Sequence, residues 1–158
     1  MDRAKLLELA GCTGTFLDIG TGPLTTIAAK NGLKVTSIDI DEERLDEEKE
    51  NAKAEGVFDR IDFVKADALS LPFPDNSFDF AVSYGALHHI DEKDRDKFVD
   101  EALRVAKKIV IADFDKETFP HGGEYKMVDY SWLKKKLGNF DYHYIDGMYV
   151  YITAPCKK

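Results

Sequence analysis

The feature that most constrains the fold of this chain is a regular alternation between short apolar runs and segments with helical patterning. Five apolar runs are predicted to be strands, at residues 15–19, 33–40, 61–66, 78–83 and 108–114. Segments with the composition of helices fall at about 3–10, 24–30, 41–55 and 92–105. Strands that alternate with helices in this way predict a mostly parallel sheet with right-handed crossovers.

The last part of the chain departs from this alternation. After a helix predicted at about 130–137, two apolar runs at 140–145 and 148–154 are separated only by Asp146-Gly147. A two-residue Asp-Gly connection is typical of a β-hairpin, so these strands should be antiparallel. The predicted fold class is α/β: a doubly wound, mostly parallel seven-stranded sheet with a C-terminal antiparallel hairpin.

A single domain over residues 1–158 is expected, with a short N-terminal helix within 1–13 and the hairpin at 139–155. The length suits one domain, and no repeat or linker divides the chain. No window resembles a membrane span or a secretory signal, so we expect a cytoplasmic protein that does not bind membranes. Cys12 and Cys156 have neither CxxC spacing nor nearby histidines, so no metal site or disulfide is expected.

The charge balance constrains the class of partner. The chain has 22 Lys and Arg against 30 Asp and Glu, a formal net charge of −8. Nucleic-acid binding depends on clustered basic side chains, so this balance disfavours nucleic acid and favours a small or cationic substrate. Much of the acid is concentrated in 41–50, which would also suit a solvated helix face.

Candidate binding residues follow the strands, because open parallel sheets bind ligands at the carboxyl ends of their strands. The first strand ends in Asp18-Ile19-Gly20-Thr21-Gly22, where glycines permit a tight turn close to a ligand. The second ends in Asp39, 19 residues beyond Gly20, where a carboxylate can accept both hydroxyls of a ribose.

The next two strand ends carry further polar groups. Asp67-Ala68 follows the third strand and would place an acceptor and a small residue beside a flat base. Ser83-Tyr84-Gly85 ends the fourth, and His88-His89 follows. Each signal alone also has a structural interpretation: Asp39 would cap the next helix, Asp67 a turn, and a histidine would be satisfied at a helix start. Their joint occurrence at four successive strand ends favours a binding site.

These segments resemble the motifs of class I S-adenosylmethionine-dependent methyltransferases, of the small-molecule type with a Leu-His-His motif after strand four. The similar stretches are 16–22, 35–39, 64–68, 71–79 and 87–90. The terminal hairpin matches the family's sixth and seventh strands. Two departures are Leu24, where the family often has a third glycine, and the absence of its Leu-Lys-Pro-Gly-Gly turn before strand five.

The resemblance implies S-adenosyl-L-methionine as the cofactor. Gly20 and Gly22 would hold its methionine part, Asp39 its ribose and Asp67 its adenine amino group. Asp18 matches the family acid that faces the cofactor's amino group. The predicted cofactor site is completed by neighbouring residues at the strand ends, Ile40, Ala68 and Ser83.

The resemblance also implies methyl transfer to an unidentified acceptor, most simply a small molecule. The catalytic candidates beside the methyl are Tyr84, His88 and His89, which act as a base only if the acceptor must lose a proton and otherwise shape the wall or pack. Asp113 and the 119–125 loop are further acceptor-side candidates. Because the opening segment is short, a second copy or a partner chain would complete the acceptor pocket.

Two other functions remain as alternatives. A catalytically silent cofactor-binding subunit that serves a partner protein would also suit the short opening segment. A nicotinamide dehydrogenase would share Gly20, Gly22 and Asp39, but its third glycine would fall at Thr25 and it has no closing hairpin. Base methylation is disfavoured, because 83–86 does not match Asn-Pro-Pro-Tyr.

Overall fold

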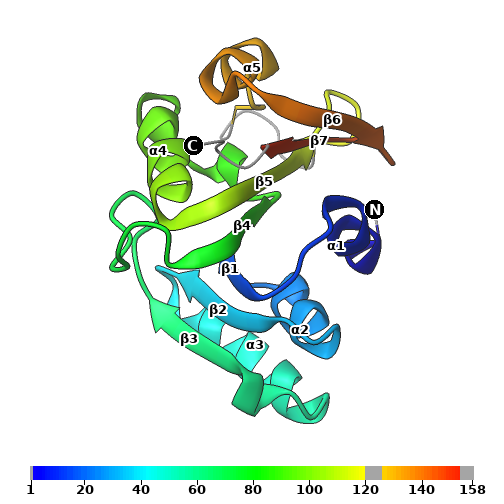
Figure 1. The fold of residues 1–158 in the computed structure, drawn as a ribbon, viewed down its shortest axis with the longest axis vertical. Helices are drawn as coiled ribbons and strands as arrows, with labels where there is room; N and C mark the ends of the chain where they lie inside the picture. The colour runs from blue at the N-terminus through cyan, green and yellow to red at the C-terminus, as the bar shows by residue number, and fades with distance from the viewer. Residues whose placement is uncertain (1, 120–125, 154–158) are drawn as a thin grey trace.

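The protein folds around one seven-stranded sheet with strand order β3-β2-β1-β4-β5-β7-β6 (Figure 1). The computed structural model describes residues 2–119 and 126–153. Its strands are β1 Thr15–Ile19, β2 Lys34–Asp39, β3 Ile61–Lys65, β4 Phe78–Tyr84, β5 Ala106–Phe114, β6 Phe140–Ile145 and β7 Met148–Thr153. The first five strands pair in parallel, whereas β7 is antiparallel to β5 and to β6. The predicted fold class is confirmed.

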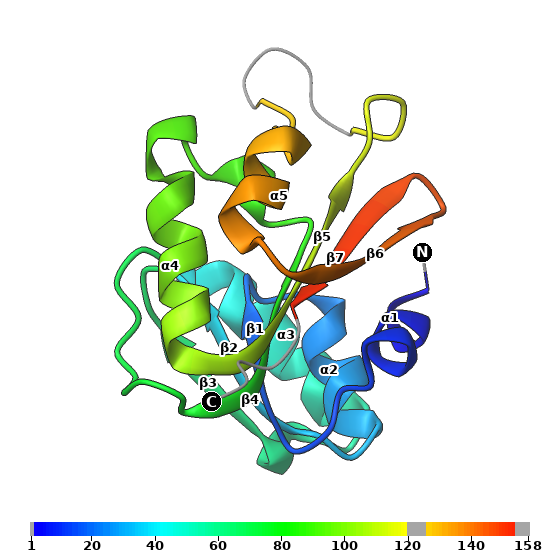
Figure 2. The same cartoon turned by 45° about the horizontal axis from the view of Figure 1, so that its top comes forward.

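Helices cover both faces of the sheet (Figure 2). They are α1 Arg3–Ala10, α2 Pro23–Lys30, α3 Glu42–Ala54, α4 Arg95–Val105 and α5 Tyr130–Leu137, with 3-10 turns at Phe58–Arg60, Leu87–His89 and Glu92–Asp94. Buried residues of α1, α2 and α3 form one hydrophobic core with the sheet, and those of α4 and α5 form a second core. The molecule therefore has three layers, with the sheet in the middle.

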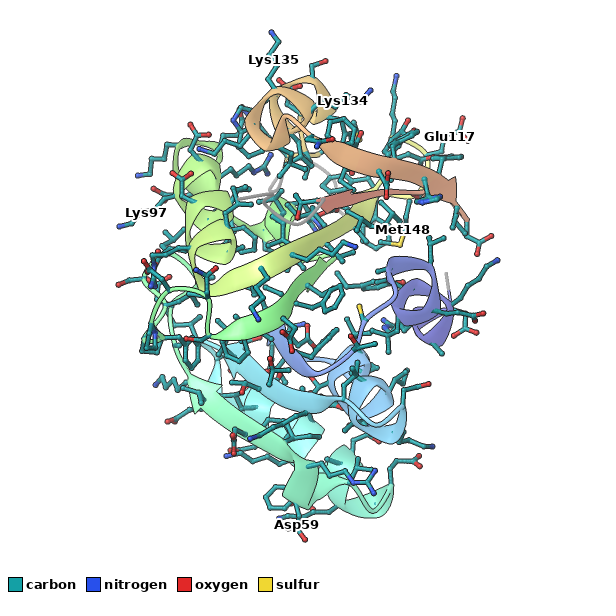
Figure 3. All side chains as sticks on the ribbon, in the orientation of Figure 1. Asp59, Lys97, Glu117, Lys134, Lys135 and Met148 are labelled. Atoms are coloured by element: carbon teal, nitrogen blue, oxygen red, sulfur yellow. The ribbon has the colours of Figure 1, made fainter. Side chains whose placement is uncertain are left out.

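Residues along the helices explain which face each helix buries. On α4, Phe98 and Val99 are buried, and Lys97 points outward (Figure 3). On α5, Leu133 is fully buried, while Lys134 and Lys135 project from the molecule. This one-sided pattern is that of surface helices packed on a sheet.

Helix and hairpin ends follow the local chemistry expected of them. Asp41 caps α3 by accepting a hydrogen bond from the backbone N–H of Glu43 at 2.9 Å. Pro23 occupies the first turn of α2, where it loses no hydrogen bond. Asp146 and Gly147 both have positive φ, at 51° and 78°, as a tight two-residue hairpin turn requires.

Most predicted boundaries agree with the structure to within one residue, and two differ by more. The helix expected from residue 92 begins with a 3-10 turn, and regular α-helix starts only at Arg95. The fifth strand begins at Ala106 rather than Lys108, because Ala106 already pairs with Phe78 of β4. Residue 154 of the predicted last strand, Cys156 and residues 120–125 of the 119–125 loop lie outside the described residues. No helix in the described part of the chain is both long and apolar enough to cross a membrane.

Candidate functional site

A cavity of about 300 Å³ opens at the carboxyl ends of β1, β2 and β3, beside the loop that follows β4. It lies where strand order reverses between β1 and β4, the position at which doubly wound sheets bind ligands. Its lining residues are Ile19, Gly20, Ile38, Asp39, Ile40, Asp41, Arg44, Ala66, Asp67, Ala68, Ala86, His89, Ile90 and Phe98. A larger depression of about 420 Å³ at the outer strand β3 contains none of the predicted residues.

The turn after β1 brings the backbone to the edge of the cavity. The N–H groups of Gly20 and Thr21 both donate to the carbonyl oxygen of Ile38 at 3.0 Å. Gly20 has φ of 96°, and a Cβ there would lie 3.2 Å from the Cβ of Ala86. Glycine at this position therefore permits both the turn and the close approach of the loop after β4. Gly22 is the N-cap residue of α2 but is not among the lining residues.

Asp39 lies at the end of β2, in the wall of the cavity. Its Oδ1 accepts a hydrogen bond from the backbone N–H of Asp41 at 3.0 Å, and its Oδ2 is 3.9 Å from Nε of Arg44. Because Asp41 caps α3, the structural alternative that Asp39 caps this helix is wrong. Its carboxylate is instead held at the cavity between a backbone donor and a guanidinium.

Ile40, Asp67 and Ala68 also line the cavity. Ile40 is 65% exposed although it is a large apolar residue. Asp67 accepts a hydrogen bond from the N–H of Leu69 at 2.9 Å, so it caps a short turn and also lines the cavity. An exposed apolar side chain, a small residue and carboxylates suit a flat base attached to a polar sugar.

Asp18 lies beneath the turn rather than in the cavity lining. It is 1% exposed, and its Oδ2 accepts a hydrogen bond from Thr25 at 2.7 Å. Burial, only partly offset by this hydrogen bond, raises the pKa of Asp18 to about 7. The hydroxyl of Thr25 lies 2.8 Å from that of Ser37, which lies 2.7 Å from that of Thr21. A buried chain of hydroxyl groups thus links Asp18 to the glycine turn.

Ser83 and Tyr84 do not reach the cavity lining. Ser83 is 2% exposed on β4, and its hydroxyl has no hydrogen-bond partner among the described residues. The ring of Tyr84 lies under the guanidinium of Arg3, 4.8 Å from its carbon atom, so Tyr84 packs toward α1. Partial burial raises the pKa of Tyr84.

The two histidines after β4 have opposite environments. His88 is 1% exposed, and its Nδ1 lies 2.9 Å from Oδ1 of Asp113. His89 is exposed and lines the cavity. Of the three acceptor-side candidates Tyr84, His88 and His89, the structure therefore brings only His89 to the cavity.

Sequence reasoning missed several lining residues. Arg44 lies close after Asp39, in the first turn of the next helix, so a basic residue at this position was a usable local signal. Phe98 and Ile90 reach the cavity from α4 and the segment before it. No local pattern distinguishes Phe98 from other core residues of α4, so only the packed structure places it at the site.

Together, the switch-point cavity, the glycine turn and the carboxylates at successive strand ends define a doubly wound α/β protein built to bind a nucleoside-like ligand. Comparison with known proteins is more specific. The model of the methyltransferase domain family matches residues 17–111. The chain belongs to this family, and the predicted class, a class I S-adenosylmethionine-dependent methyltransferase with S-adenosyl-L-methionine as cofactor, is confirmed.

Curated relatives and solved structures agree with this assignment. The chain is 36% identical over 105 residues to 27-O-demethylrifamycin SV methyltransferase of Amycolatopsis mediterranei, a match that covers 63% of this chain and 38% of that protein. It is 34% identical over 115 residues to the ubiquinone/menaquinone biosynthesis C-methyltransferase of Shewanella piezotolerans, covering 71% and 43%. The matches thus span about two fifths of these relatives. An S-adenosylmethionine-dependent methyltransferase from Aquifex aeolicus superposes with a TM-score of 0.73 at 25% identity, covering 96% of this chain and 88% of that one.

Proposed function

We propose that this chain catalyses methyl transfer from S-adenosylmethionine to a small-molecule acceptor, and that the cavity at β1, β2 and β3 holds the cofactor. The observation that carries the proposal is the meeting of Gly20, Asp39, Ile40, Asp67 and Ala68 in one cavity. These residues come from three different strand ends.

The residues present fit the cofactor. Asp39 supplies carboxylate oxygens that can accept the ribose hydroxyls, and Asp67 can accept the adenine amino group. Ile40 and Ala68 offer an apolar surface and space for the base. The glycine turn at Gly20 allows the methionine part to lie close to the backbone. Asp18, whose raised pKa reflects burial, lies beneath this turn and would favour a cationic group above it.

The chain's contribution to the reaction is chiefly orientation. The bound cofactor supplies a methyl group on a cationic sulfonium, which an acceptor atom attacks in line. Holding two reactants in the right geometry can contribute about 7–11 kcal/mol. Gly20 and Asp67 would fix the two ends of the cofactor and Asp39 its ribose, while the loop 86–90 would border the incoming acceptor.

His89 is the acceptor-side group that the geometry favours. It is exposed at the cavity and can contact an acceptor directly. As a base it would contribute roughly 10²- to 10⁴-fold to the rate, and the rate would follow histidine titration. If His89 only shapes the cavity wall, it would contribute less to the rate of methyl transfer and would add no pH dependence to that rate. We favour the wall role, because methyl transfer does not require a base when the acceptor atom is already nucleophilic.

The proposed class of methyl acceptor rests on the net charge of the chain and on the names of its relatives. A net charge of −8 is poorly suited to nucleic acid. The matched relatives are named as methyltransferases of a rifamycin and of ubiquinone and menaquinone biosynthesis, which are small molecules. A second copy or a partner chain that completes the acceptor pocket stays a prediction, which light scattering of the purified chain would test.

Calorimetry with S-adenosylmethionine, S-adenosylhomocysteine and NAD tests the proposal. We expect both sulfur ligands to bind and to raise the melting temperature, and NAD to do neither. No heat and no thermal shift with either sulfur ligand at millimolar concentration would overturn the assignment. Binding without methyl transfer to any of a panel of small nucleophiles, and without automethylation, would instead favour the silent cofactor-binding subunit.

A further inference from the structure

The loop that follows β4 lines one part of the cavity, and buried side chains outside the cavity hold it in place. Ala86, His89 and Ile90 line the cavity, whereas His88 between them is buried. Ala86 is the residue that a Cβ on Gly20 would approach to 3.2 Å. This contact places the loop beside the glycine turn.

Asp113, near the end of β5, binds this loop through both its carboxylate oxygens. It is fully buried. Its Oδ2 accepts a hydrogen bond from the backbone N–H of His88 at 3.2 Å, and its Oδ1 lies 2.9 Å from the ring Nδ1. Because a carboxylate oxygen accepts, Nδ1 of His88 is the donor. Asp113 therefore fixes both the main chain and the ring plane of His88.

The ring of His88 packs against His89, the histidine that lines the cavity. It lies against the ring of His89 with a centroid distance of 4.2 Å and an interplanar angle of 35°. The rings of Phe114 and Phe119 contact His88 edge-on, at 5.7 Å and 5.1 Å. His88 is thus confined on several sides, and it presents a fixed surface to the exposed His89.

Arg95, the first residue of α4, holds the same loop from its other end. It is 4% exposed, and its guanidinium donates to the carbonyl oxygens of Ile90 at 2.9 Å and His88 at 3.1 Å. It also donates to the carbonyl oxygens of Lys126 and Met127, just before α5. One buried guanidinium thereby joins the cavity loop to a distant segment.

We propose that Asp113, His88 and Arg95 form a positioning frame that holds His89 at the methionine end of the cofactor cavity. This inference rests on the proposed function. Side chains that contact a substrate must be held within about 0.5 Å of a productive position, and neighbours that lock their rotamers achieve this. His88 is accordingly a positioning residue, not the base that its sequence position suggests.

Three measurements on Asp113→Asn test the frame. The substitution keeps the size of the side chain but removes its charge. In the free protein, we expect hydrogen exchange at the amide of His88 to accelerate about tenfold or more, because a hydrogen bond to a charged acceptor is stronger than one to a neutral acceptor. On addition of S-adenosylhomocysteine, the ring resonance of His89, assigned through His89→Ala, should shift at least twice as far in the wild type as in Asp113→Asn.

The third measurement is a double-mutant cycle on the affinity for S-adenosylhomocysteine. Asp113→Asn should weaken binding about threefold or more, and this loss should largely disappear when residue 89 is already alanine, since contacting residues couple. Equal losses in both backgrounds would overturn the frame, as would unchanged exchange at His88. If Asp113→Asn does not fold, Arg95→Lys serves in the same cycle, because lysine cannot reach four carbonyl groups.

A matched control lies on the same helix. Arg104 of α4 also donates to main-chain carbonyl oxygens, those of Leu71 at 3.0 Å and Phe73 at 2.7 Å, but it holds a loop outside the cavity. Arg104→Gln should leave the His88 amide and the His89 shift unchanged. If the wild type fails to bind S-adenosylhomocysteine, the proposed function fails, while the exchange measurement on the free protein still decides whether Asp113 holds the loop.

Discussion

The two sides of the cavity are built in different ways. On the side of β1, β2 and β3, each functional residue lies at or just beyond the end of its own strand, and neighbours in sequence hold it, as Asp41 and Arg44 hold Asp39. On the side of β4 and β5, the exposed His89 depends on residues from β5 and α4 and on carbonyl groups before α5. The first side is local in sequence, and the second is assembled from distant segments.

This difference matches the two tasks of the cavity, binding a common cofactor and binding one particular acceptor. A cofactor common to many enzymes can be bound by short motifs that recur at strand ends. An acceptor site must match one substrate, so it draws on loops and on whatever the fold places behind them. We therefore expect substitutions on the two sides to have different effects.

The largest expected effect concerns Asp18, beneath the cofactor side. Its pKa is raised to about 7 from an ordinary value of 3.8, so the unfolded chain loses this proton at lower pH than the folded protein. Stability is therefore fully present below about pH 4 and falls as the pH rises to about 7. Asp18→Asn removes this penalty. Its free energy of unfolding should exceed that of the wild type by about 2–4 kcal/mol above pH 8 and match it near pH 4.

Urea titrations at several pH values would measure this difference. Asp79 provides a control of opposite sign, because hydrogen bonds from the backbone and hydroxyl of Thr15 lower its pKa. Asp79→Asn should destabilise the protein at neutral pH, and the loss should shrink as the pH falls through the lowered pKa of Asp79. A wild type as stable at pH 8 as Asp18→Asn would show that burial does not penalise this carboxylate.

The next effect concerns Asp39, the proposed ribose-binding residue. Asp39→Ala should weaken binding of S-adenosylhomocysteine by about 10- to 150-fold, because hydrogen bonds to a charged acceptor are worth about 1.5–3 kcal/mol. Asp62→Ala is the control, since Asp62 is an exposed carboxylate on β3 outside the cavity. Calorimetry would measure both affinities, and a change within about twofold for Asp39→Ala would reduce this residue to a structural role.

The same contrast explains how far the sequence could predict the molecule. Strand and helix positions followed from apolar periodicity, and the hairpin from Asp146-Gly147. Gly20, Asp39 and Asp67 could be placed at one cavity because the carboxyl ends of parallel strands share an edge. The direction in which a side chain leaves a strand was not accessible: Ser83 and Tyr84 end β4, yet one is buried in the sheet and the other packs on Arg3.

The histidines show the same limit more sharply. The sequence presents His88 and His89 as equivalent neighbours, but in the structure His88 is buried against Asp113, 25 residues away, and two phenylalanine rings, whereas His89 lies at the cavity. Arg95 carried no signal at all, because an arginine at the start of a charged helix is ordinarily solvated. Its burial depends on carbonyl groups that the tertiary fold supplies.

The smallest expected effect is at the mouth of the cavity. Ile40 is 65% exposed, so Ile40→Ser should barely change stability. Full burial of such a side chain is worth about 1.5–3 kcal/mol, so partial burial against an adenine should make the affinity for S-adenosylhomocysteine about three- to tenfold lower in the variant. Leu103→Ser, at a 39% exposed residue of α4 outside the cavity, should change neither quantity. Equal affinities of both variants for S-adenosylhomocysteine would show that Ile40 does not contact the ligand.

A crystal structure of the chain with S-adenosylhomocysteine tests the central claim most directly. We predict that the ribose hydroxyls lie within hydrogen-bonding distance of Asp39, that the adenine lies between Ile40 and Ala68, and that the sulfur lies between Gly20 and His89. A ligand bound anywhere else, or one with its sulfur turned away from the loop 86–90, would contradict it.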